Sequence, residues 1–256
     1  MSCLPRVSIV TPAFNSGATI KDTVRSVEEQ QFNHLEHIVI DGGSTDDTCE
    51  ILARSPTVTS WSSEPDEGIA DAFNKGIRRC SGELIGIINS DDFYASNAIS
   101  IIWDAYSSLA PGRREQTVLH GDICVIRSGE ANRRLRPRLR GSGRWHWSFY
   151  FEMPVHHPTC FVPKQLYERV GTYRTDFRVA MDFEWILRAW RQGARFHYLP
   201  RLIVNFRAGG LSGQNTRLAL DEVYRAQRLH SLPRLTTKAA FLGKSVVNRL
   251  KALNSR

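Results

Sequence analysis

The stretch Ile88-Asn89-Ser90-Asp91-Asp92 is central to the fold prediction, because it joins the end of an apolar run to two adjacent carboxylates. The apolar run, residues 84–88, has the length and composition of a buried strand. In open α/β sheets, ligands bind outside the carboxyl ends of the strands. Two carboxylates there offer hard oxygen ligands for Mg²⁺ or Mn²⁺, which can bridge a diphosphate. The alternative is an ordinary Asp-rich turn with a helix cap.

The sequence before this stretch alternates strand-like runs with helical periodicity. A capping signal at Ser44 and Asp47 predicts a helix that carries Ile51 and Leu52. The other predicted elements are strands at 7–10, 35–40 and 58–62, and helices at 20–27 and 69–79. This alternation is typical of a nucleotide-binding α/β half-domain.

The predicted strand ends in this half are polar, turn-forming or acidic, at residues 11–15, 41–44 and 89–92. No G-x-G-x-x-G follows the first strand, and no G-x-x-x-x-G-K-[ST] occurs anywhere in the sequence. Both patterns build phosphate-binding loops, so their absence argues against a dinucleotide-binding fold and a P-loop fold.

The second half is predicted to be less regular. A helix from about Ser96 leads to a strand, and a basic stretch and an aromatic run follow. The elements predicted after that helix are strands at 118–123, 195–199 and 202–206, helices at 164–170 and 183–190, and two helices after Gly213.

Composition restricts the class of protein. The 256 residues are 41% hydrophobic, enough for a full α/β core, and no run of 18 apolar residues occurs. Residues 1–6 lead directly into a strand-like run, so we expect no signal peptide and a cytoplasmic protein. The five cysteines are scattered without C-x-x-C spacing, which argues against disulfides and structural zinc.

The formal charge of +8 is concentrated at residues 127–144 and 217–256. Basic segments suit an anionic partner, which could be a nucleic acid, an acidic membrane surface or a phosphorylated substrate, but they are equally typical of a solvated surface. In the last helix, apolar residues alternate with Lys and Arg, as in a helix that lies in a membrane surface or docks on a protein.

The polar strand ends belong to a longer series of motifs. These are Val10-Thr11-Pro12-Ala13-Phe14-Asn15, Ile40-Asp41-Gly42-Gly43-Ser44-Thr45-Asp46, the segment 64–77, Asn89-Ser90-Asp91-Asp92, His156-His157-Pro158-Thr159-Cys160-Phe161, Ala180-Met181-Asp182-Phe183-Glu184-Trp185 and Gly209-Gly210-Leu211-Ser212. In this order and spacing, over roughly residues 6–215, the sequence closely resembles the inverting glycosyltransferase family 2 of the bacterial surface-polysaccharide type.

The resemblance implies an α/β fold of the GT-A type, with a mixed sheet flanked by helices and a C-terminal helical appendage. It implies a donor-binding half at about 1–122, an acceptor half at about 123–213 and a basic helical tail at 214–256. The implied reaction is sugar transfer from a nucleoside-diphosphate sugar, UDP-linked in preference to GDP-linked. The acceptor is expected to be a glycan or a lipid-linked saccharide.

The resemblance also assigns site residues. The residues expected to contact the donor are Thr11, Pro12, Phe14, Asn15, Asp41, Asp71, Asn74, Asn89 and Ser90. Asn89 replaces the first Asp of the family's D-x-D pattern, which leaves Asp91 as the expected ligand of Mn²⁺ or Mg²⁺. Asp92 is a second candidate ligand. His157 is a third, although a lone histidine is more often structural.

Asp182 is the expected catalytic residue, since inverting transfer needs a carboxylate that takes the acceptor's proton. Met181 stands where the family often has an acid, so Glu184 is the alternative base. On the acceptor side we expect Glu184, Trp147 and His156. The family's processive members carry Q-x-x-R-W, which Leu187-Arg188-Ala189-Trp190 does not match, so we expect a single addition.

Two other functions remain open from the sequence. A nucleotidyltransferase that makes sugar nucleotides has similar cation chemistry, but Asn15-Ser16-Gly17-Ala18 is a poor match to its Gly-rich basic loop. A nucleic-acid-binding protein could use the arginines at 133–140 on phosphates, yet no helix-turn-helix, zinc or RNP-type motif accompanies them, and we expect no nucleic-acid partner. The expected peripheral partner is an anionic membrane surface on the cytoplasmic face, bound by the basic tail.

Overall fold

The computed structural model describes residues 6–127, 129–138, 148–150, 153–209 and 215–254, and it describes side chains as far as residue 244. The described strands form one mixed sheet of nine in the order β3-β2-β1-β4-β8-β6-β9-β5, with β7 paired to β6. The strands are β1 (Val7–Ala13), β2 (Leu35–Asp41), β3 (Ser60–Ser63), β4 (Leu84–Ile87), β5 (Phe93–Tyr94), β6 (Thr117–Ile126), β7 (Arg133–Leu135), β8 (Phe161–Pro163) and β9 (Arg195–Arg207). This α/β architecture confirms the predicted fold class.

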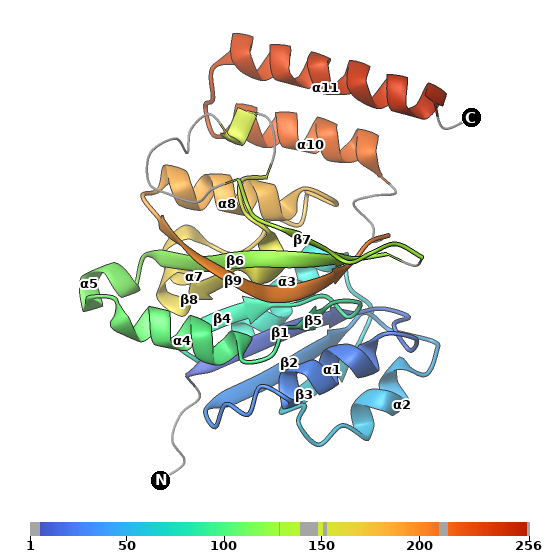
Figure 1. Cartoon of the computed structure of the whole chain (residues 1–256), viewed down its shortest axis with the longest axis vertical. Helices are drawn as coiled ribbons and strands as arrows, with labels where there is room; N and C mark the ends of the chain where they lie inside the picture. The colour runs from blue at the N-terminus through green and yellow to red at the C-terminus, as the bar shows by residue number, and fades with distance from the viewer. Residues whose placement is uncertain (1–5, 128, 139–147, 151–152, 210–214, 255–256) are drawn as a thin grey trace.

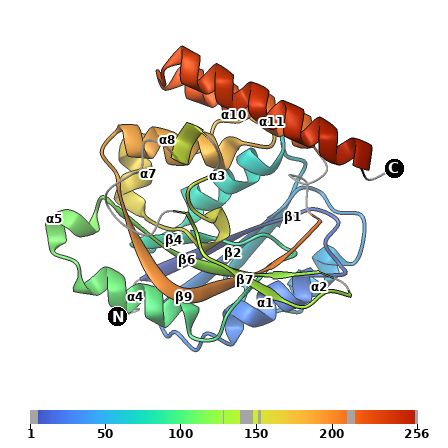
Figure 2. The ribbon, with the colours of Figure 1, turned by 45° about the horizontal axis from the view of Figure 1, so that its top comes forward.

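Helices cover both faces of the sheet (Figures 1 and 2). The helices are α1 (Ile20–Glu28), α2 (Thr48–Ala53), α3 (Ile69–Arg79), α4 (Ala98–Ser108), α5 (Pro111–Arg114), α7 (Lys164–Val170), α8 (Met181–Arg191), α10 (Thr216–Leu229) and α11 (Arg234–Asn254), with the 3₁₀ turn η1 (His157–Thr159). Successive residues of a strand point to opposite faces. Val10 therefore packs in the core with α3, α7 and α8, whereas Ile9 packs in the core with α4.

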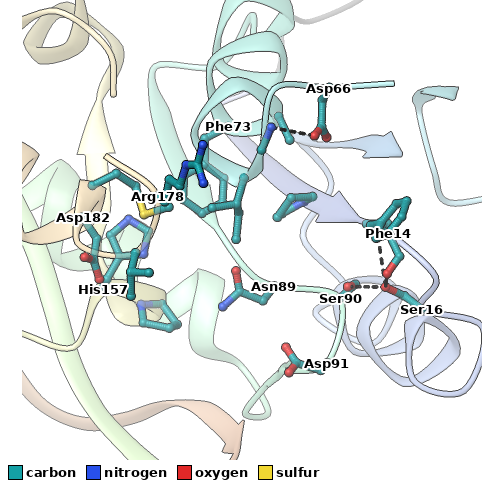
Figure 3. Close-up of a pocket in the computed structure, with 18 of the residues that line it drawn as sticks. Phe14, Ser16, Asp66, Phe73, Asn89, Ser90, Asp91, His157, Arg178 and Asp182 are labelled. Atoms are coloured by element: carbon teal, nitrogen blue, oxygen red, sulfur yellow. Dashed lines mark hydrogen bonds between the residues drawn. The ribbon is translucent and has the colours of Figure 1, made fainter. Parts of the chain in front are cut away.

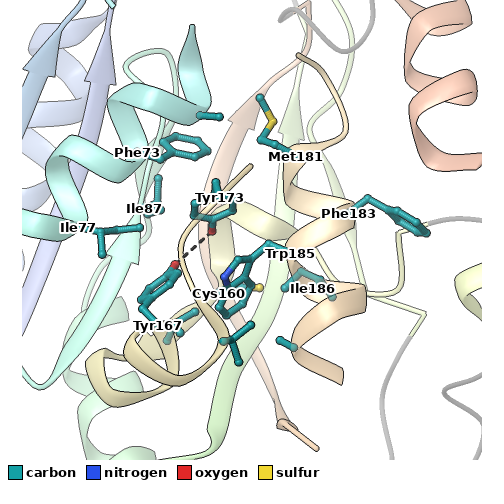
Figure 4. Packing of buried hydrophobic residues seen from close by; sticks show 14 of the residues in the cluster. Phe73, Ile77, Ile87, Cys160, Tyr167, Tyr173, Met181, Phe183, Trp185 and Ile186 are labelled. Atoms are coloured by element: carbon teal, nitrogen blue, oxygen red, sulfur yellow. Dashed lines mark hydrogen bonds between the residues drawn. The ribbon is translucent and has the colours of Figure 1, made fainter. Parts of the chain in front are cut away.

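The largest core joins the two halves of the chain through aromatic side chains (Figure 4). Trp185 of α8 is completely buried, and its ring centroid lies 4.8 Å from that of Tyr167 in α7. The Tyr167 and Tyr173 hydroxyls lie 3.1 Å apart, and the Tyr173 ring contacts Phe73 of α3 edge-on at 5.1 Å. Because these rings are shared, α8 has a fixed position relative to α3.

Two predicted strands are one strand in the structure. The segments expected at 195–199 and 202–206 both belong to β9, which runs parallel to β6. The sequence suggested a break because proline cannot donate to a strand ladder, and Pro200 lies between the two segments. The register between β6 and β9 shifts at this point, so β9 continues past the proline.

The helix expected after Ser44 and Asp47 forms, but neither residue caps it with its side chain. Asp47 is the N-cap residue and makes no side-chain capping bond. The side chain of Asp46 instead accepts hydrogen bonds from the backbone N–H (3.1 Å) and hydroxyl (2.5 Å) of Thr48.

The C-terminal segment consists of two helices, as predicted, and α10 lies between α8 and α11 (Figure 1). Ala226 of α10 and Leu232 are buried in the main hydrophobic core. Gln227 donates a hydrogen bond of 2.6 Å to the backbone oxygen of Phe149. The first helix of the expected tail is therefore packed into the core. Among the described residues, no helix is both long and apolar enough to cross a membrane.

Helix α3 packs closely on β1 through Gly76. A Cβ atom at this position would lie 2.3 Å from Cγ1 of Val10, which is completely buried. We predict that Gly76→Ala lowers the free energy of unfolding by about 1–3 kcal/mol, the usual cost of overpacking a core. Urea unfolding followed by circular dichroism measures this change.

The matched control is Gly243→Ala in α11, where an added Cβ meets no described atom within 4 Å. This change should raise the free energy of unfolding by about 0.5–1 kcal/mol, because alanine loses less backbone entropy in a helix. An unchanged unfolding midpoint in Gly76→Ala would contradict the packing described for α3.

Candidate active site

A cleft of about 600 Å³ opens at the carboxyl ends of β1 and β4 (Figure 3). From β1 the chain builds β2 and β3 on one side, whereas β4 lies on the other side of β1. The loops that leave β1 and β4 therefore diverge and leave a crevice, as at the switch point of other open α/β sheets. The lining residues are Pro12–Ser16, Thr19, Asp66, Gly68, Ile69, Ala72, Phe73, Asn89–Asp91, His157, Pro158, Arg178, Val179, Met181, Asp182 and Phe206.

The loop after β1 presents an aromatic ring to this cleft. Phe14 is 63% exposed, which is unusual for a large apolar side chain beside a well-packed sheet. The next residue, Asn15, has a left-handed backbone with φ of 47°, and its side-chain oxygen accepts a hydrogen bond of 2.9 Å from the N–H of Thr45. Asn15 thus fixes the loop, and Phe14 is available to stack on a flat ligand.

The loops after β1 and β4 are hydrogen-bonded to each other. The hydroxyls of Ser16 and Ser90 lie 2.7 Å apart, and the N–H of Ser16 donates to the Thr48 hydroxyl at 2.8 Å. The expected donor residues Pro12, Asn89 and Ser90 all lie on this part of the wall. Thr11 does not, because it is completely buried and its hydroxyl lies 2.9 Å from Nε2 of His37.

Asp41 lies behind the wall and is completely buried. Its carboxylate accepts hydrogen bonds from the Ser63 hydroxyl (2.7 Å) and from the N–H groups of Gly43 (3.1 Å) and Ser44 (2.9 Å). Burial alone would raise the pKa of Asp41, but hydrogen bonds from Ser44 and Ser63 lower it below the usual value. In this arrangement the carboxylate stabilises the turn after β2 and is not among the residues that line the cleft, so its contact with a nucleotide base stays a prediction.

The segment before and within α3 contributes different residues from those predicted. Asp71 forms an ion pair of 3.2 Å with Lys75. The Asn74 side chain bonds to the backbone N–H and oxygen of Tyr173, both at 2.8 Å. Neither lines the cleft, whereas Asp66 and Phe73 do. The predicted segment thus reaches the cleft, but the predicted residues within it hold the structure together.

Asp91 and Asp92 have different surroundings. Asp91 is half-buried on the cleft wall, and burial raises the pKa of its carboxyl group. Asp92 is completely buried, and its carboxylate accepts hydrogen bonds from the N–H of Arg207 (3.0 Å) and the amide of Asn89 (3.3 Å). Burial and the neighbouring Asp91 raise the pKa of Asp92 to about 7. A bound cation would stabilise the ionised form of both groups.

The residues present are compatible with a divalent cation that is held mainly by the phosphates of a bound nucleotide and by water. Within the described ranges, no three His, Cys, Asp or Glu side chains are grouped so that they could hold a metal ion. Mg²⁺ at nucleotide sites often takes only one or two carboxylates, the remaining ligands being phosphates and water. Asp91 suits this role because it is on the wall, whereas Asp92 is buried behind it.

His157 lies next to Tyr173 and Phe73, away from Asp91. Its Nε2 lies 2.8 Å from the Tyr173 hydroxyl, and its ring stacks on Phe73 with centroids 5.6 Å apart. Burial lowers the pKa of His157, so the ring is neutral at pH 7. Figure 3 shows His157 next to Asp182, with Asp91 on the other side of Asn89. His157 lines the same cleft as Asp91, and its role as a ligand of the cation stays a prediction.

Asp182 lies on the cleft wall in the first turn of α8. The helix begins at Met181 with Ala180 as its N-cap, so Asp182 is not the capping residue. One carboxylate oxygen accepts a hydrogen bond of 2.6 Å from the N–H of Phe183. Burial raises the pKa of Asp182, and the nearby His157 opposes this effect. A carboxylate with a raised pKa binds a proton more readily, which suits a general base.

Two of the three expected acceptor-side residues, Glu184 and His156, are absent from the cleft lining. Glu184 is completely buried and pairs with Arg188 (3.0 Å) and His230 (2.8 Å). His156 lies outside the cleft lining, and its Nε2 is buried without a hydrogen-bond partner among the described residues. Trp147 lies outside the described residues.

Arg178 is a cleft residue that the sequence interpretation missed. It lies on the wall four positions before Asp182. Nothing in the sequence distinguishes it from Arg174, which is equally basic and four positions further back. The difference appears only in the structure, where Arg174 forms an ion pair of 2.8 Å with Asp176 and is absent from the cleft lining.

Known proteins are similar to this chain in sequence or in fold. The model of "Glycosyl transferase family 2" matches residues 8–168. An uncharacterised glycosyltransferase of Mycobacterium tuberculosis is 35% identical over 198 residues, which cover 74% of this chain and 70% of that protein.

Two solved structures show the fold at low sequence identity. S. aureus TarS 1–349 in complex with UDP-GlcNAc has a TM-score of 0.66 at 16% identity, covering 92% of this chain and 70% of that one. A mannosyltransferase from Pyrobaculum calidifontis in complex with GDP-Man and Mn²⁺ has a TM-score of 0.65 at 18% identity, covering 95% and 70%. The chain therefore belongs to glycosyltransferase family 2 and has the GT-A fold, with its cleft at the carboxyl ends of β1 and β4.

Proposed function

We propose that this glycosyltransferase inverts the sugar configuration as it moves the sugar from a nucleoside-diphosphate donor to an acceptor hydroxyl. The main support is the arrangement of Asp91 and Asp182, which line one cleft on different sides of Asn89 (Figure 3). Inverting transfer needs the leaving diphosphate and the proton acceptor on opposite sides of the sugar. A donor whose diphosphate lies at Asp91 would have its sugar near Asn89, between the two carboxylates.

In this proposal, the Asp182 carboxylate takes the proton of the acceptor hydroxyl as the hydroxyl oxygen bonds to the anomeric carbon. The bond from that carbon to the diphosphate breaks, and the diphosphate leaves with the electron pair. The backbone N–H of Phe183 orients the carboxylate at 2.6 Å. The half-apolar lining, which includes Phe73 and Met181, would limit competition from water for the anomeric carbon.

We propose that Asp91 holds a Mn²⁺ or Mg²⁺ ion together with the donor's phosphates. The ion would supply positive charge that stabilises the leaving diphosphate. Phe14 would stack on the nucleotide base, because its exposed ring borders the same cleft. We favour a UDP-sugar as donor, with a GDP-sugar as the alternative. TarS and the Pyrobaculum mannosyltransferase, which share the fold, were solved with UDP-GlcNAc and GDP-Man respectively.

The proposed donor chemistry predicts metal-dependent nucleotide binding. The test is calorimetry of UDP- and GDP-sugars with and without Mn²⁺. One nucleotide class should bind at least about tenfold more tightly with Mn²⁺ than without it. Asp91→Asn should lose most of this metal dependence, because an amide is a weaker ligand than a carboxylate. Release of nucleoside diphosphate should follow the same order.

The matched control is Asp104→Asn, which changes an exposed carboxylate on α4 away from the cleft lining. This variant should bind the donor as the wild type does. Absence of both binding and hydrolysis for every donor would refute the proposed function.

The base assignment predicts separate effects on turnover and binding. Asp182→Asn should reduce kcat by about 10²–10⁴-fold, the usual contribution of a general base. The dissociation constant for the donor with Mn²⁺ should stay within about twofold, since Asp182 lies on the acceptor side of Asn89. Near-normal turnover would contradict the assignment.

We propose that the acceptor is a glycan or a lipid-linked saccharide of surface polysaccharide, and that each encounter adds one sugar. Arg188 lies in the segment that was compared with the Q-x-x-R-W pattern of processive members. It donates hydrogen bonds of 2.7 Å to the backbone oxygens of Val170 and Thr172. It therefore stabilises α8 and does not reach the cleft lining. Mass spectrometry of the product should detect a single added sugar, and a ladder of products would contradict this proposal.

We further propose that α11 attaches the enzyme to an anionic membrane surface on the cytoplasmic face. Leu235 and Leu242 of α11 are 87% and 53% exposed, with Lys238 between them on the same side at helical spacing. The opposite side is covered, since Thr237 is completely buried and the Phe241 ring lies 5.2 Å from that of Tyr224. Exposed leucines beside lysines are typical of helices that lie in an anionic interface.

Vesicle sedimentation measures this attachment. The wild type should sediment with vesicles that contain anionic phospholipid more than with neutral ones, and Leu235→Ser with Leu242→Ser should reduce the bound fraction several-fold. Trp61→Ser, at a 37% exposed apolar residue on the distant strand β3, is the control and should bind as the wild type does. Equal sedimentation with both kinds of vesicle would contradict the proposal.

A further inference from the structure

Arg178 lies on the cleft wall, and no residue that the structure describes forms an ion pair with it. Its side chain is exposed and belongs to the lining. Among the described residues, no carboxylate forms an ion pair with the Arg178 guanidinium. Three other arginines in the same region do form ion pairs. Arg174 and Arg225 pair with Asp176, and Arg188 pairs with Glu184 at 3.0 Å. An unpaired guanidinium in a binding cleft is suited to an anionic ligand.

The backbone that carries Arg178 is held firmly in place. The buried carboxylate of Glu222 in α10 accepts hydrogen bonds from three successive N–H groups, those of Arg178 (2.7 Å), Val179 (2.8 Å) and Ala180 (2.8 Å). Ala180 is the N-cap of the helix that carries Asp182. The Glu222 side chain therefore fixes both the backbone of Arg178 and the start of α8. The position of Arg178 relative to Asp182 is thereby fixed as well.

Arg178 lies on the acceptor side of the cleft. Figure 3 shows it on the same side of Asn89 as Asp182 and His157, with Asp91 on the other side. His157 is neutral because burial lowers its pKa, so it does not supply positive charge there. The other charged lining residues are the carboxylates of Asp66, Asp91 and Asp182. Arg178 is thus the one cationic side chain among the described lining residues.

We propose that Arg178 binds an anionic group, phosphate or carboxylate, on the acceptor molecule. This inference rests on the proposed transfer function, in which Asp91 holds the donor's diphosphate and Asp182 faces the acceptor. A guanidinium forms two parallel hydrogen bonds with either anion, which orients the bound molecule as well as attracting it. The acceptor class is therefore a saccharide with a phosphate or uronate charge near the hydroxyl that is attacked.

Calorimetry on the enzyme saturated with UDP and Mn²⁺ tests this assignment. The probes are methyl β-glucoside, methyl β-glucuronide and glucose 6-phosphate, which offer no charge, a carboxylate and a phosphate. At least one anionic probe should bind at least about tenfold more tightly than the neutral probe. Arg178→Gln should abolish this preference, and Arg178→Lys should keep part of it. The stronger of the two anionic probes identifies the group.

Arg174→Gln is the matched control, because Arg174 belongs to the same segment and already pairs with Asp176. This variant should keep the full preference for the anionic probe. Equal affinity for charged and neutral probes in the wild type, including no detectable binding of any, would overturn the proposal. A tenfold loss of UDP affinity in Arg178→Gln would also overturn it, by making the arginine a donor contact. Failure of the wild type to bind UDP would refute the proposed function instead.

Discussion

The position of β1 at the centre of its parallel neighbours is the constraint on which the site depends. The β1 strand pairs with β2 along its whole length and with β4 over residues 7–10, so its carboxyl end extends beyond β4. The loops that follow two such strands diverge and leave a crevice at the carboxyl ends of the strands. The hydrogen bond between Ser16 and Ser90 sets the distance between the loops. The distance between the two loops places Phe14 and Asp91 on the cleft wall.

The side of the cleft that α8 forms depends on contacts that are distant in sequence. Helix α8 carries Asp182, and its position follows from the buried rings of Trp185, Tyr167 and Tyr173 below it and from Glu222 beside its first turn. Tyr173 also bonds through its backbone to Asn74 of α3. Helices α3 and α8 are therefore connected by a few buried polar bonds within an aromatic core.

Much of the fold and the outline of the site could be predicted from the sequence. Strand ends such as Asn89-Ser90-Asp91 are visible as polar residues after an apolar run, and Asp182 occupies a recognisable motif. The sequence could not tell which polar side chains were already hydrogen-bonded. Asn74 bonds to Tyr173 and Asp41 accepts a hydrogen bond from Ser63, and both partners are remote in the chain, whereas Asp71 pairs with Lys75 only four positions later. Arg178 was missed for the converse reason, since its lack of an ion-pair partner within the described part of the chain is visible only in the folded structure.

The bond between Glu222 and residues 178–180 has a consequence for how the protein is synthesised. Residues of the β1 to β4 unit leave the ribosome first, and this unit contains its own buried core and the Asp91 loop. The N–H groups at 178–180 bond to a carboxylate that is translated more than forty positions later. Since chains fold in the order of synthesis, the β1 to β4 side of the cleft can form well before the α8 side. Before residue 222 is made, the N–H groups at 178–180 lack the carboxylate to which they bond in the complete fold.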